Sequence, residues 1–330
     1  MFLDKYIEKV GTSTEFPIFN NKISTNVVIA TNDLFLSQFK DDYFNAVDIV
    51  VKYLAIEDYY GLNNYGFRLY EKMQNNRINE NWNERFIELI KSFEKNGMKN
   101  NFPIETDISY SIHDGAHRLA LAMFFRINDV FVKVYNIDNT RKTYDLNWFK
   151  KNKFTNEEII IIENKLKELL KLTRNPYYCV LWPPTRNIFQ KIEKEIELVE
   201  NGIDLIDSEY LELNKDDFKQ FMYDVYSTDD ILLEKLDLKY KYLIQSLKKD
   251  NYNKEKLPLM VLKVILDNPD FKLKSFTGLP QSKKTMRIKS NIRNTNNNYI
   301  TDYHYDIIMH MTDNSIQNND VERILKKVKR

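Results

Sequence analysis

The stretch SIHDGAHRLALAMFF, residues 111–125, joins a short alternating run to a run that is almost entirely apolar. The alternation predicts a strand that ends at Asp114, and the apolar run predicts a buried helix that begins at Ala116. Gly115 lies between them and is one of only seven glycines in 330 residues. We therefore expect a strand-to-helix turn whose conformation depends on this glycine.

The segments around this turn complete a compact α/β unit. Strand-like alternation marks FPIETD and VFVKVYNI, residues 102–107 and 130–137. Before residue 100 the pattern is helical, with apolar residues near a 3.6-residue period. The expected helices are DDYFNAVDIVVKYLAIEDYYG, GFRLYEKMQ and WNERFIELIKSFEKNG, which begin at residues 41, 66 and 82.

A second domain is expected after residue 150, so that residues 1–150 form one domain and residues 151–330 the other. A helix start is predicted at Thr155, where a hydroxyl cap is followed by two acids. Strands alternate with helices beyond it, which predicts an α/β domain with a mostly parallel sheet. The expected strands are CVLW, IDLIDSEYLEL, LMVLKVIL and YDIIMHM.

Composition limits the classes of function. The 49 basic and 48 acidic residues give a formal charge of +1, so the whole chain has no general attraction to nucleic acid or anionic membrane. The start, MFLDKYIEKV, carries Asp4 and Glu8 where a secretory signal would be basic and then apolar, and no long apolar stretch follows, which predicts a cytoplasmic protein without membrane insertion. The single Cys179 excludes an internal disulfide, and its apolar surroundings predict a buried, inert thiol.

The 111–125 turn has the features of an anion site. The first N–H groups of a helix have no partner within the helix and attract anions, and Gly115 would let a ligand approach closely. His117 and Arg118 oppose the helix dipole unless an anion binds there. The alternative is that Asp114 caps the helix, His117 belongs to the core and Arg118 pairs with a carboxylate.

A helix ending in KNG, the strand PIETD and then Asp-Gly-x-His-Arg-Leu-Ala resemble the ParB/sulfiredoxin-like superfamily over residues 80–136. In that superfamily the turn binds nucleotide phosphates: CTP in ParB partition proteins, ATP in sulfiredoxin, and ADP or ATP in free serine kinases. The resemblance implies that Gly115 and Ala116 form the phosphate turn and that His117 and Arg118 contact the phosphates. It also implies that Asp114 positions Mg²⁺ or takes a proton.

The chain departs from that superfamily in two ways. Ala116 stands where sulfiredoxin has a cysteine, which disfavours sulfinic acid reduction. ParB has a more arginine-rich box followed by a helix-turn-helix, and here an α/β domain is expected instead. The segments LWPP, TGLP and HMTDN resemble a bacterial family associated with cell-surface polysaccharide gene sets.

A second group of candidate residues lies near the C-terminus. His310 and Asp313 are expected where a strand ends, and His304 lies close by in sequence. Residues 271–301 hold seven basic residues and no acid. Ser282 is predicted to cap a helix whose first turns carry basic residues, either as a substrate-binding site or as a solvated surface. The predicted substrate-binding residues are Lys283, Lys284, Arg287, His310 and Asp313.

These features predict a nucleotide-dependent phosphotransferase that uses ATP or CTP with Mg²⁺. Its catalytic residues would be Asp114, His117 and Arg118, and its acceptor a small hydroxylated metabolite or sugar, in cell-surface polysaccharide metabolism. The alternative is a ParB-like nucleic-acid-binding protein or nuclease, against which the neutral charge and the missing helix-turn-helix count. A nucleotide-sensing scaffold without turnover stays open, as does the oligomeric state.

Overall fold

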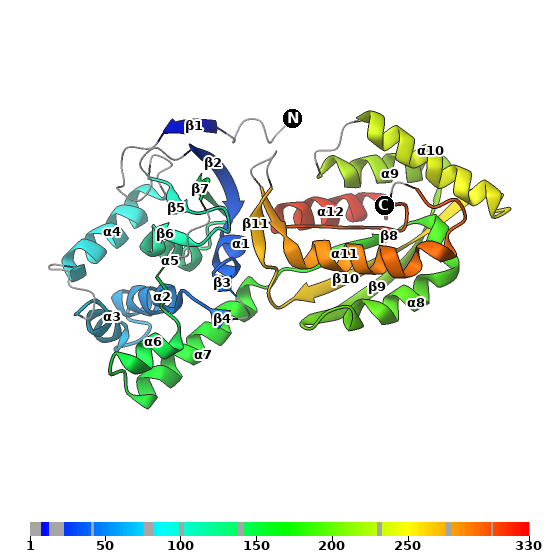
Figure 1. Cartoon of the computed structure of the whole chain (residues 1–330). Coiled ribbons are helices and arrows are strands. Elements are labelled where there is room, and N and C mark those ends of the chain that lie inside the picture. Colours follow the sequence, from blue (N-terminus) through cyan, green and yellow to red (C-terminus); the bar gives the residue numbers. More distant parts are fainter. Residues whose placement is uncertain are drawn as a thin grey trace. The chain divides into compact units, whose positions relative to one another are not determined.

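The computed structural model describes residues 8–12, 23–40, 43–75, 82–98, 102–137, 142–229, 233–274, 279–304 and 306–329. The fold is α/β, and the chain forms two compact units (Figure 1). The first unit is Met1–Thr173 with Asp270–Gln281, and the second is Arg174–Pro269 with Ser282–Arg330. The division therefore falls after Thr173 and not near residue 150, and a short later segment belongs to the first unit.

A five-stranded sheet organises the first unit in the order β1-β2-β7-β5-β6. Strands β5 and β7 run parallel, and the other neighbours run antiparallel. The strands are β1 (Glu8–Thr12), β2 (Ile23–Ala30), β5 (Ile104–Thr106), β6 (Ile112–Asp114) and β7 (Asp129–Tyr135). The sequence patterns predicted β5, β6 and β7, whereas β2 lies in a region expected to be helical. Its ISTNVVIA sequence is rich in β-branched residues, which is the signal for a strand.

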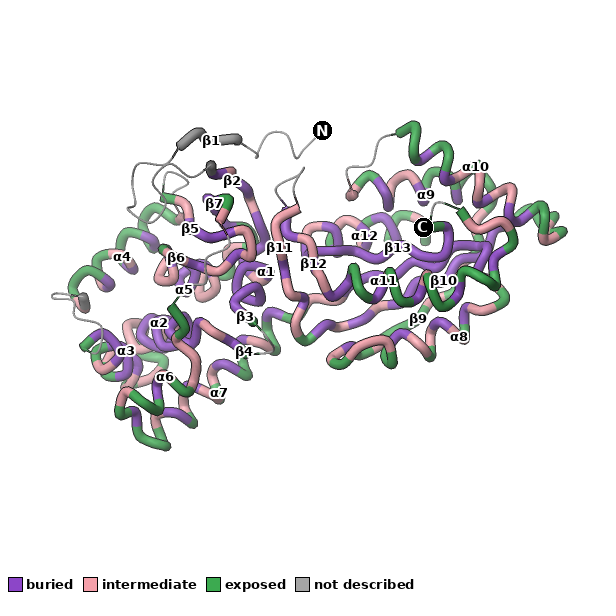
Figure 2. Tube along the Cα trace, viewed as in Figure 1, coloured by how far each residue is buried: buried purple, intermediate pink, exposed green. Residues whose placement is uncertain are grey.

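Helices cover this sheet and form the core with it. Helix α2 packs against α3 and α5, and its LAI segment is fully buried (Figure 2). The helices are α1 (Thr31–Leu36), α2 (Val47–Tyr59), α3 (Gly66–Asn75), α4 (Trp82–Asn96), α5 (Ala116–Phe124), α6 (Leu146–Lys151) and α7 (Asn156–Thr173). Two small strand pairs complete the unit: β3 (Phe39–Lys40) with β4 (Tyr43–Phe44), and β11 (Phe271–Leu273) with β12 (Pro280–Ser282).

Helix α7 explains where the first unit ends. Thr155 caps it as predicted, because its hydroxyl accepts from Glu158 N at 3.3 Å while the Glu158 carboxylate accepts from Thr155 N at 2.8 Å. Its apolar face, which includes Ile162 and Leu169, enters the core of the first unit against α1 and α2. An amphipathic helix does not reveal from its own sequence which of two cores it joins.

The second unit contains a four-stranded sheet in the order β13-β8-β10-β9. Every neighbouring pair is antiparallel, so the expectation of a mostly parallel sheet was wrong. The strands are β8 (Tyr177–Leu181), β9 (Ile203–Asn214), β10 (Lys256–Leu266) and β13 (Met309–Met311). Strands β8 and β9 do run in the same direction, as do β10 and β13, but another strand lies between the members of each pair. This is the split βαβ arrangement.

The helices decide this topology. Two helices separate β9 from β10 and return the chain to the end of the sheet that it left, so these two strands pair antiparallel. The helical elements are η1 (Pro183–Ile188), α8 (Phe189–Glu195), η2 (Ile196–Leu198), α9 (Lys215–Ser227), α10 (Leu233–Lys249), α11 (Lys283–Asn296), η3 (Asn297–Tyr299) and α12 (Ser315–Val328). All five residues of β8 are buried, which requires cover on both faces of the sheet.

Candidate functional site

The predicted turn is present, and Gly115 is essential to its shape. Strand β6 ends at Asp114, Gly115 has a φ of 96°, and α5 begins at Ala116. A Cβ atom at Gly115 would lie 3.0 Å from Ile104 Cγ1 and 3.1 Å from the Arg118 guanidinium. Both the left-handed backbone and the tight packing therefore select glycine. Because glycine has no side chain to cap the helix, the first N–H groups of α5 depend on other acceptors.

The Arg118 side chain connects the turn to the segment before β5 by hydrogen bonds. Its NH1 group donates to the carbonyl oxygens of Phe102 at 2.6 Å and Pro103 at 2.7 Å, and its NH2 group donates to Asp114 Oδ2 at 2.5 Å. A guanidinium has five N–H donors, so two of them carry no hydrogen bond within the described ranges. Arg118 thus pairs with a carboxylate, as the structural alternative expected, and keeps donors for an anion.

His117 is directed into an aromatic cluster. Its Nε2 lies 2.8 Å from the Tyr70 hydroxyl, and its ring meets the Phe86 ring edge-on at 4.7 Å. Tyr70 is on α3 and Phe86 on α4, so His117 ties the start of α5 to both helices. The His117 imidazole is therefore already engaged by Tyr70 and Phe86, and a contact with a phosphate would have to be made from this position.

Glu105 is a residue that the sequence reasoning did not single out. It is 4% exposed, and its Oε1 accepts from the Tyr135 hydroxyl at 3.2 Å. Its Oε2 is buried and has no hydrogen-bond partner among the described residues. Burial raises the pKa of Glu105, Asp114 raises it further, and Tyr135, Lys133 and Arg118 lower it. The feature of the sequence that could have identified Glu105 is an acid between an apolar and a neutral residue in the middle of a short strand.

Glu105 belongs to a polar row that crosses the sheet and ends at the turn. In register, Asn26 of β2 is opposite Lys133 of β7, Lys133 is opposite Glu105, and Glu105 is opposite Asp114. Residues opposite each other in a ladder point to the same face, with Cβ atoms about 5 Å apart. One face of the sheet therefore carries amide, ammonium and carboxylate groups up to the start of α5.

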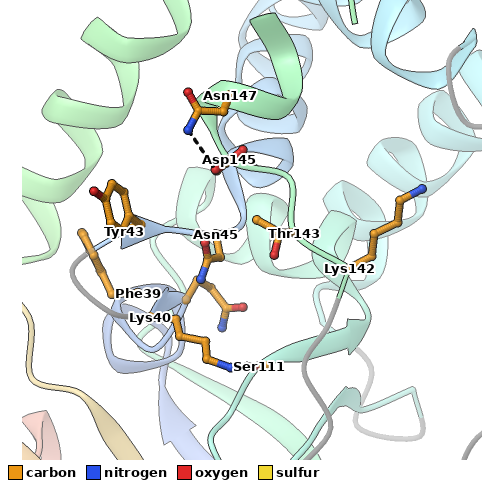
Figure 3. A pocket seen from close by; sticks show the side chains of 10 residues that line it. Phe39, Lys40, Tyr43, Asn45, Ser111, Lys142, Thr143, Asp145 and Asn147 are labelled. Carbon is orange, nitrogen blue, oxygen red and sulfur yellow. Dashed lines mark hydrogen bonds between the residues drawn. The ribbon is translucent and has the colours of Figure 1, made fainter. Parts of the chain in front are cut away.

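A cavity of about 410 Å³ opens in the same unit. Side chains from the β3–β4 pair and from the segment leading into α6 line it (Figure 3). Its wall includes Tyr43, Asn45, Ser111 and Asn147, which are aromatic, amide and hydroxyl groups. Ser111 precedes β6, whose other end is Asp114, so the two α-carbons lie about 10 Å apart along the strand.

In the predicted basic patch of the second unit, Lys284 is buried whereas Arg287 is exposed. Lys284 is 5% exposed and donates to the carbonyl oxygens of Asn201 at 2.5 Å and Gly202 at 3.0 Å. Arg287 pairs with Glu200 at 2.6 Å, and Lys283 is half-buried in the first turn of α11. Ser282 caps α11 as predicted, because its Oγ accepts from Thr285 N at 3.1 Å. Lys284 and Arg287 are therefore both engaged by groups of residues 200–202.

Asp313 and His310 are buried close to β13. Asp313 accepts from Lys289 at 2.7 Å and from the Thr285 hydroxyl. Burial acts to raise the pKa of Asp313, but the Lys289 charge and these hydrogen bonds hold it below its ordinary value. His310 is 2% exposed, with Nδ1 at 3.3 Å from Asp229 Oδ2. His304 is separate, lying 3.5 Å from Asp302 with its side chain half-exposed.

Three other sequence expectations can be compared with the structure. Cys179 is buried, and burial raises its pKa to about 12, so the thiol is inert as expected. None of the helices in the described part of the chain is long and apolar enough to cross a bilayer. Within the same ranges, no three His, Cys, Asp or Glu side chains are grouped so that they alone could hold a metal ion.

Comparisons with known proteins give a weak structural similarity for this chain. No family model matches it, and no curated protein matches it. Among solved structures it is similar to a nucleoside-diphosphate kinase from Borrelia burgdorferi, described as a transition-state mimic with bound vanadate and ADP. That similarity has 13% identity and a TM-score of 0.26, and it covers 46% of this chain and 86% of the kinase. At this TM-score it carries no argument about fold or activity.

Proposed function

We propose that this chain is a nucleotide-dependent phosphotransferase whose donor phosphates bind at the Gly115 turn. The observation that carries the proposal is the glycine-opened start of α5 with two carboxylates beside it, Asp114 and Glu105. The backbone N–H groups of Ala116, His117 and Arg118 would donate hydrogen bonds to phosphate oxygens, helped by the two remaining Arg118 donors. The resemblance to the ParB/sulfiredoxin-like superfamily supports the same assignment.

The carboxylates suit the Mg²⁺ that accompanies a nucleotide. Mg²⁺ commonly takes one or two carboxylates and completes its shell with phosphate oxygens and water, so a site with three protein ligands is not required. Within the described residues, Glu105 has a buried oxygen without a partner, and Asp114 is half-exposed with its Oδ2 engaged by Arg118. These two residues would hold the ion, which neutralises charge on the transferred phosphoryl group.

We assign the acceptor to the cavity beside Ser111. Amide, hydroxyl and aromatic groups such as Asn45, Ser111 and Tyr43 suit a small hydroxylated molecule, and the resemblance to a polysaccharide-associated family favours a sugar. If Asp114 instead accepts the proton of the attacking hydroxyl, Glu105 holds the ion without it. The nucleic-acid alternative gains no support, because Lys284 and Arg287 are engaged within the second unit.

Nucleotide binding tests the donor site. Calorimetric titration with ATP and with CTP, each with Mg²⁺, should show binding that Arg118→Ala weakens by at least about tenfold, or about 1.4 kcal/mol. Arg85→Ala, an exposed arginine of α4 in the same unit, is the matched control and should leave affinity unchanged. Circular dichroism checks that both variants fold. Equal affinities in all three proteins would remove the donor-site assignment.

Phosphoryl transfer tests turnover. The full chain is incubated with ATP or CTP, Mg²⁺ and a mixture of sugars and polyols, and products are followed by mass spectrometry. We expect a phosphorylated acceptor that Glu105→Gln and Asp114→Asn both suppress. Nucleotide binding without any transfer would identify a nucleotide-sensing scaffold instead.

A further inference from the structure

The cavity assigned to the acceptor carries more positive than negative charge. Its volume of about 410 Å³ is near the small end of the range for ligand pockets, so it suits a single sugar unit. Lys40 of β3 and Lys142 of the segment before α6 line it, and Asp145 is the one acid among its described lining residues (Figure 3). The described lining therefore has one positive charge in excess.

The Asp145 carboxylate is engaged by the start of α6. Its Oδ1 accepts from Trp148 N at 2.7 Å, and its Oδ2 accepts from Asn147 Nδ2 at 3.5 Å. Within the described ranges, neither Lys40 nor Lys142 forms a hydrogen bond or an ion pair with another residue. Both lysines are exposed, so a ligand can reach them from solvent. The two ammonium groups therefore stay available to an anion.

Two hydrogen-bonding side chains of the cavity lie on a fixed backbone. Asn45 N donates to Gln38 O at 2.9 Å, and Asn45 O accepts from Tyr144 N at 2.9 Å. Ser111 N donates to Asp107 Oδ1 at 3.0 Å, and Ser111 O accepts from Asp107 N at 3.3 Å. The Asn45 amide and the Ser111 hydroxyl themselves bind no other described residue. Each can donate and accept, so they suit the hydroxyl groups of a sugar.

Gln38 also lines the cavity, but its amide is used by the fold. Its Nε2 donates to Leu34 O and to Tyr110 O, both at 2.9 Å, and its Oε1 accepts from Ile112 N at 3.2 Å. Gln38 therefore forms part of the wall and offers little to a ligand. The groups left to select a ligand are the two lysines, the amide and the hydroxyl.

We propose that the acceptor is a sugar acid, a molecule with several hydroxyl groups and one carboxylate. This inference rests on the proposed function, because it concerns the same cavity. The ammonium groups of Lys40 and Lys142 attract the carboxylate, while Asn45 and Ser111 bind hydroxyl groups. A carboxylate carries one negative charge, which matches the excess positive charge of the lining, whereas a phosphate monoester carries nearly two at pH 7.

Matched sugars test this charge preference on the unaltered protein. Calorimetric titration of the full chain at pH 7, without nucleotide, compares glucuronate with glucose and galacturonate with galactose. At least one acid should bind at least about tenfold more tightly than its neutral partner. Equal binding within both pairs, or binding of neither acid, would overturn the proposal.

Glucose 6-phosphate distinguishes a carboxylate from a phosphate. In the same titration it should bind more weakly than the better of the two acids. Tighter binding of glucose 6-phosphate than of either acid would overturn the assignment to a carboxylate.

Lysine variants locate the preference in the cavity. Lys40→Met combined with Lys142→Met should weaken binding of the acid at least about tenfold and leave binding of the neutral sugar unchanged. Lys150→Met, at an exposed lysine of α6 outside the lining, is the matched control and should change neither. Unchanged binding of the acid in the double variant would place the acid elsewhere and overturn the inference.

The donor site can fail separately from this inference. Arg118→Ala should retain binding of the sugar acid even where it abolishes nucleotide binding. If the acid binds but no phosphoryl transfer follows with ATP or CTP and Mg²⁺, the proposed function fails and the acid site stands. If glucose or galactose is phosphorylated and neither acid is, the proposed function stands and this inference fails.

Discussion

The start of α5 and the start of α11 look alike in sequence but differ in structure. Both follow a short strand, and both carry basic residues in the first turn. Ser282 caps α11 with its own hydroxyl, while α5 begins at a glycine that offers no cap. Lys284 of α11 donates to two backbone carbonyls, whereas two donors of Arg118 of α5 bind no residue that the structure describes. At a capped helix start, a side chain accepts a hydrogen bond from one of the first backbone N–H groups. At an uncapped start, these N–H groups stay available to a ligand.

The largest effect should come from filling the space at Gly115. Gly115→Ala adds a left-handed strain of about 1–2 kcal/mol and crowding against Ile104 of about 1–3 kcal/mol. Gly97→Ala is the matched control, because Gly97 has a φ of 65° but nothing within 4 Å of its missing Cβ. Urea unfolding should therefore show a larger loss for Gly115→Ala. Equal losses would mean that the turn is not tightly packed.

The next effect compares two buried lysines, one in each unit. Lys52 pairs with Asp48 at 2.6 Å, whereas no carboxylate in the described part of the chain pairs with Lys239. Because burial lowers the pKa of Lys239 to about 7 in the fold from 10.5 in its reference state, the unfolded chain binds more protons between these values. Stability should thus rise with pH above 7, by up to about 1.4 kcal/mol per pH unit.

Lys239→Met isolates that effect. Its unfolding free energy, measured by urea denaturation from pH 7 to 9, should rise less steeply than that of the unaltered protein. Parallel curves for the two proteins would show that Lys239 stays charged throughout this range.

A somewhat smaller effect is expected at Lys284. Lys284→Met removes the donor to Asn201 O, while Gly202 O keeps the Asp267 N–H at 3.0 Å, and the loss should cost about 1–3 kcal/mol. The neighbouring Lys283→Met is the control and should cost much less, since Lys283 is half-buried. Nucleotide affinity should stay the same in both variants. Weaker nucleotide binding in Lys284→Met would restore the basic patch as a binding surface.

The smallest effect should come from the cap of α11. Ser282→Ala removes the acceptor for Thr285 N and should lower the unfolding free energy by about 1 kcal/mol. Asn314→Ala, which removes the corresponding cap of α12, should give a similar loss. No change in either variant would weaken the contrast between capped and uncapped helix starts.

Several features could be read from local sequence because their causes are local. The caps at Thr155 and Ser282, the glycine turn at Gly115 and the strands that flank it all follow from the preferences of a few adjacent residues. The strand β2 was missed although it has β-branched residues, because the helical pattern that follows it was extended backward. Glu105 was missed because an acid in a strand gains meaning only from its neighbours across the sheet.

The sequence by itself determined the identity of most helices and strands and the position of the turn at Gly115. Only the tertiary structure decided that the second sheet is antiparallel, that α7 joins the first core and that Lys284 and Arg287 are engaged within the second unit. The physical reason is the distance along the chain over which each kind of interaction acts. Backbone preferences act over a few residues, whereas strand direction, burial and charge pairing depend on residues far apart in the chain.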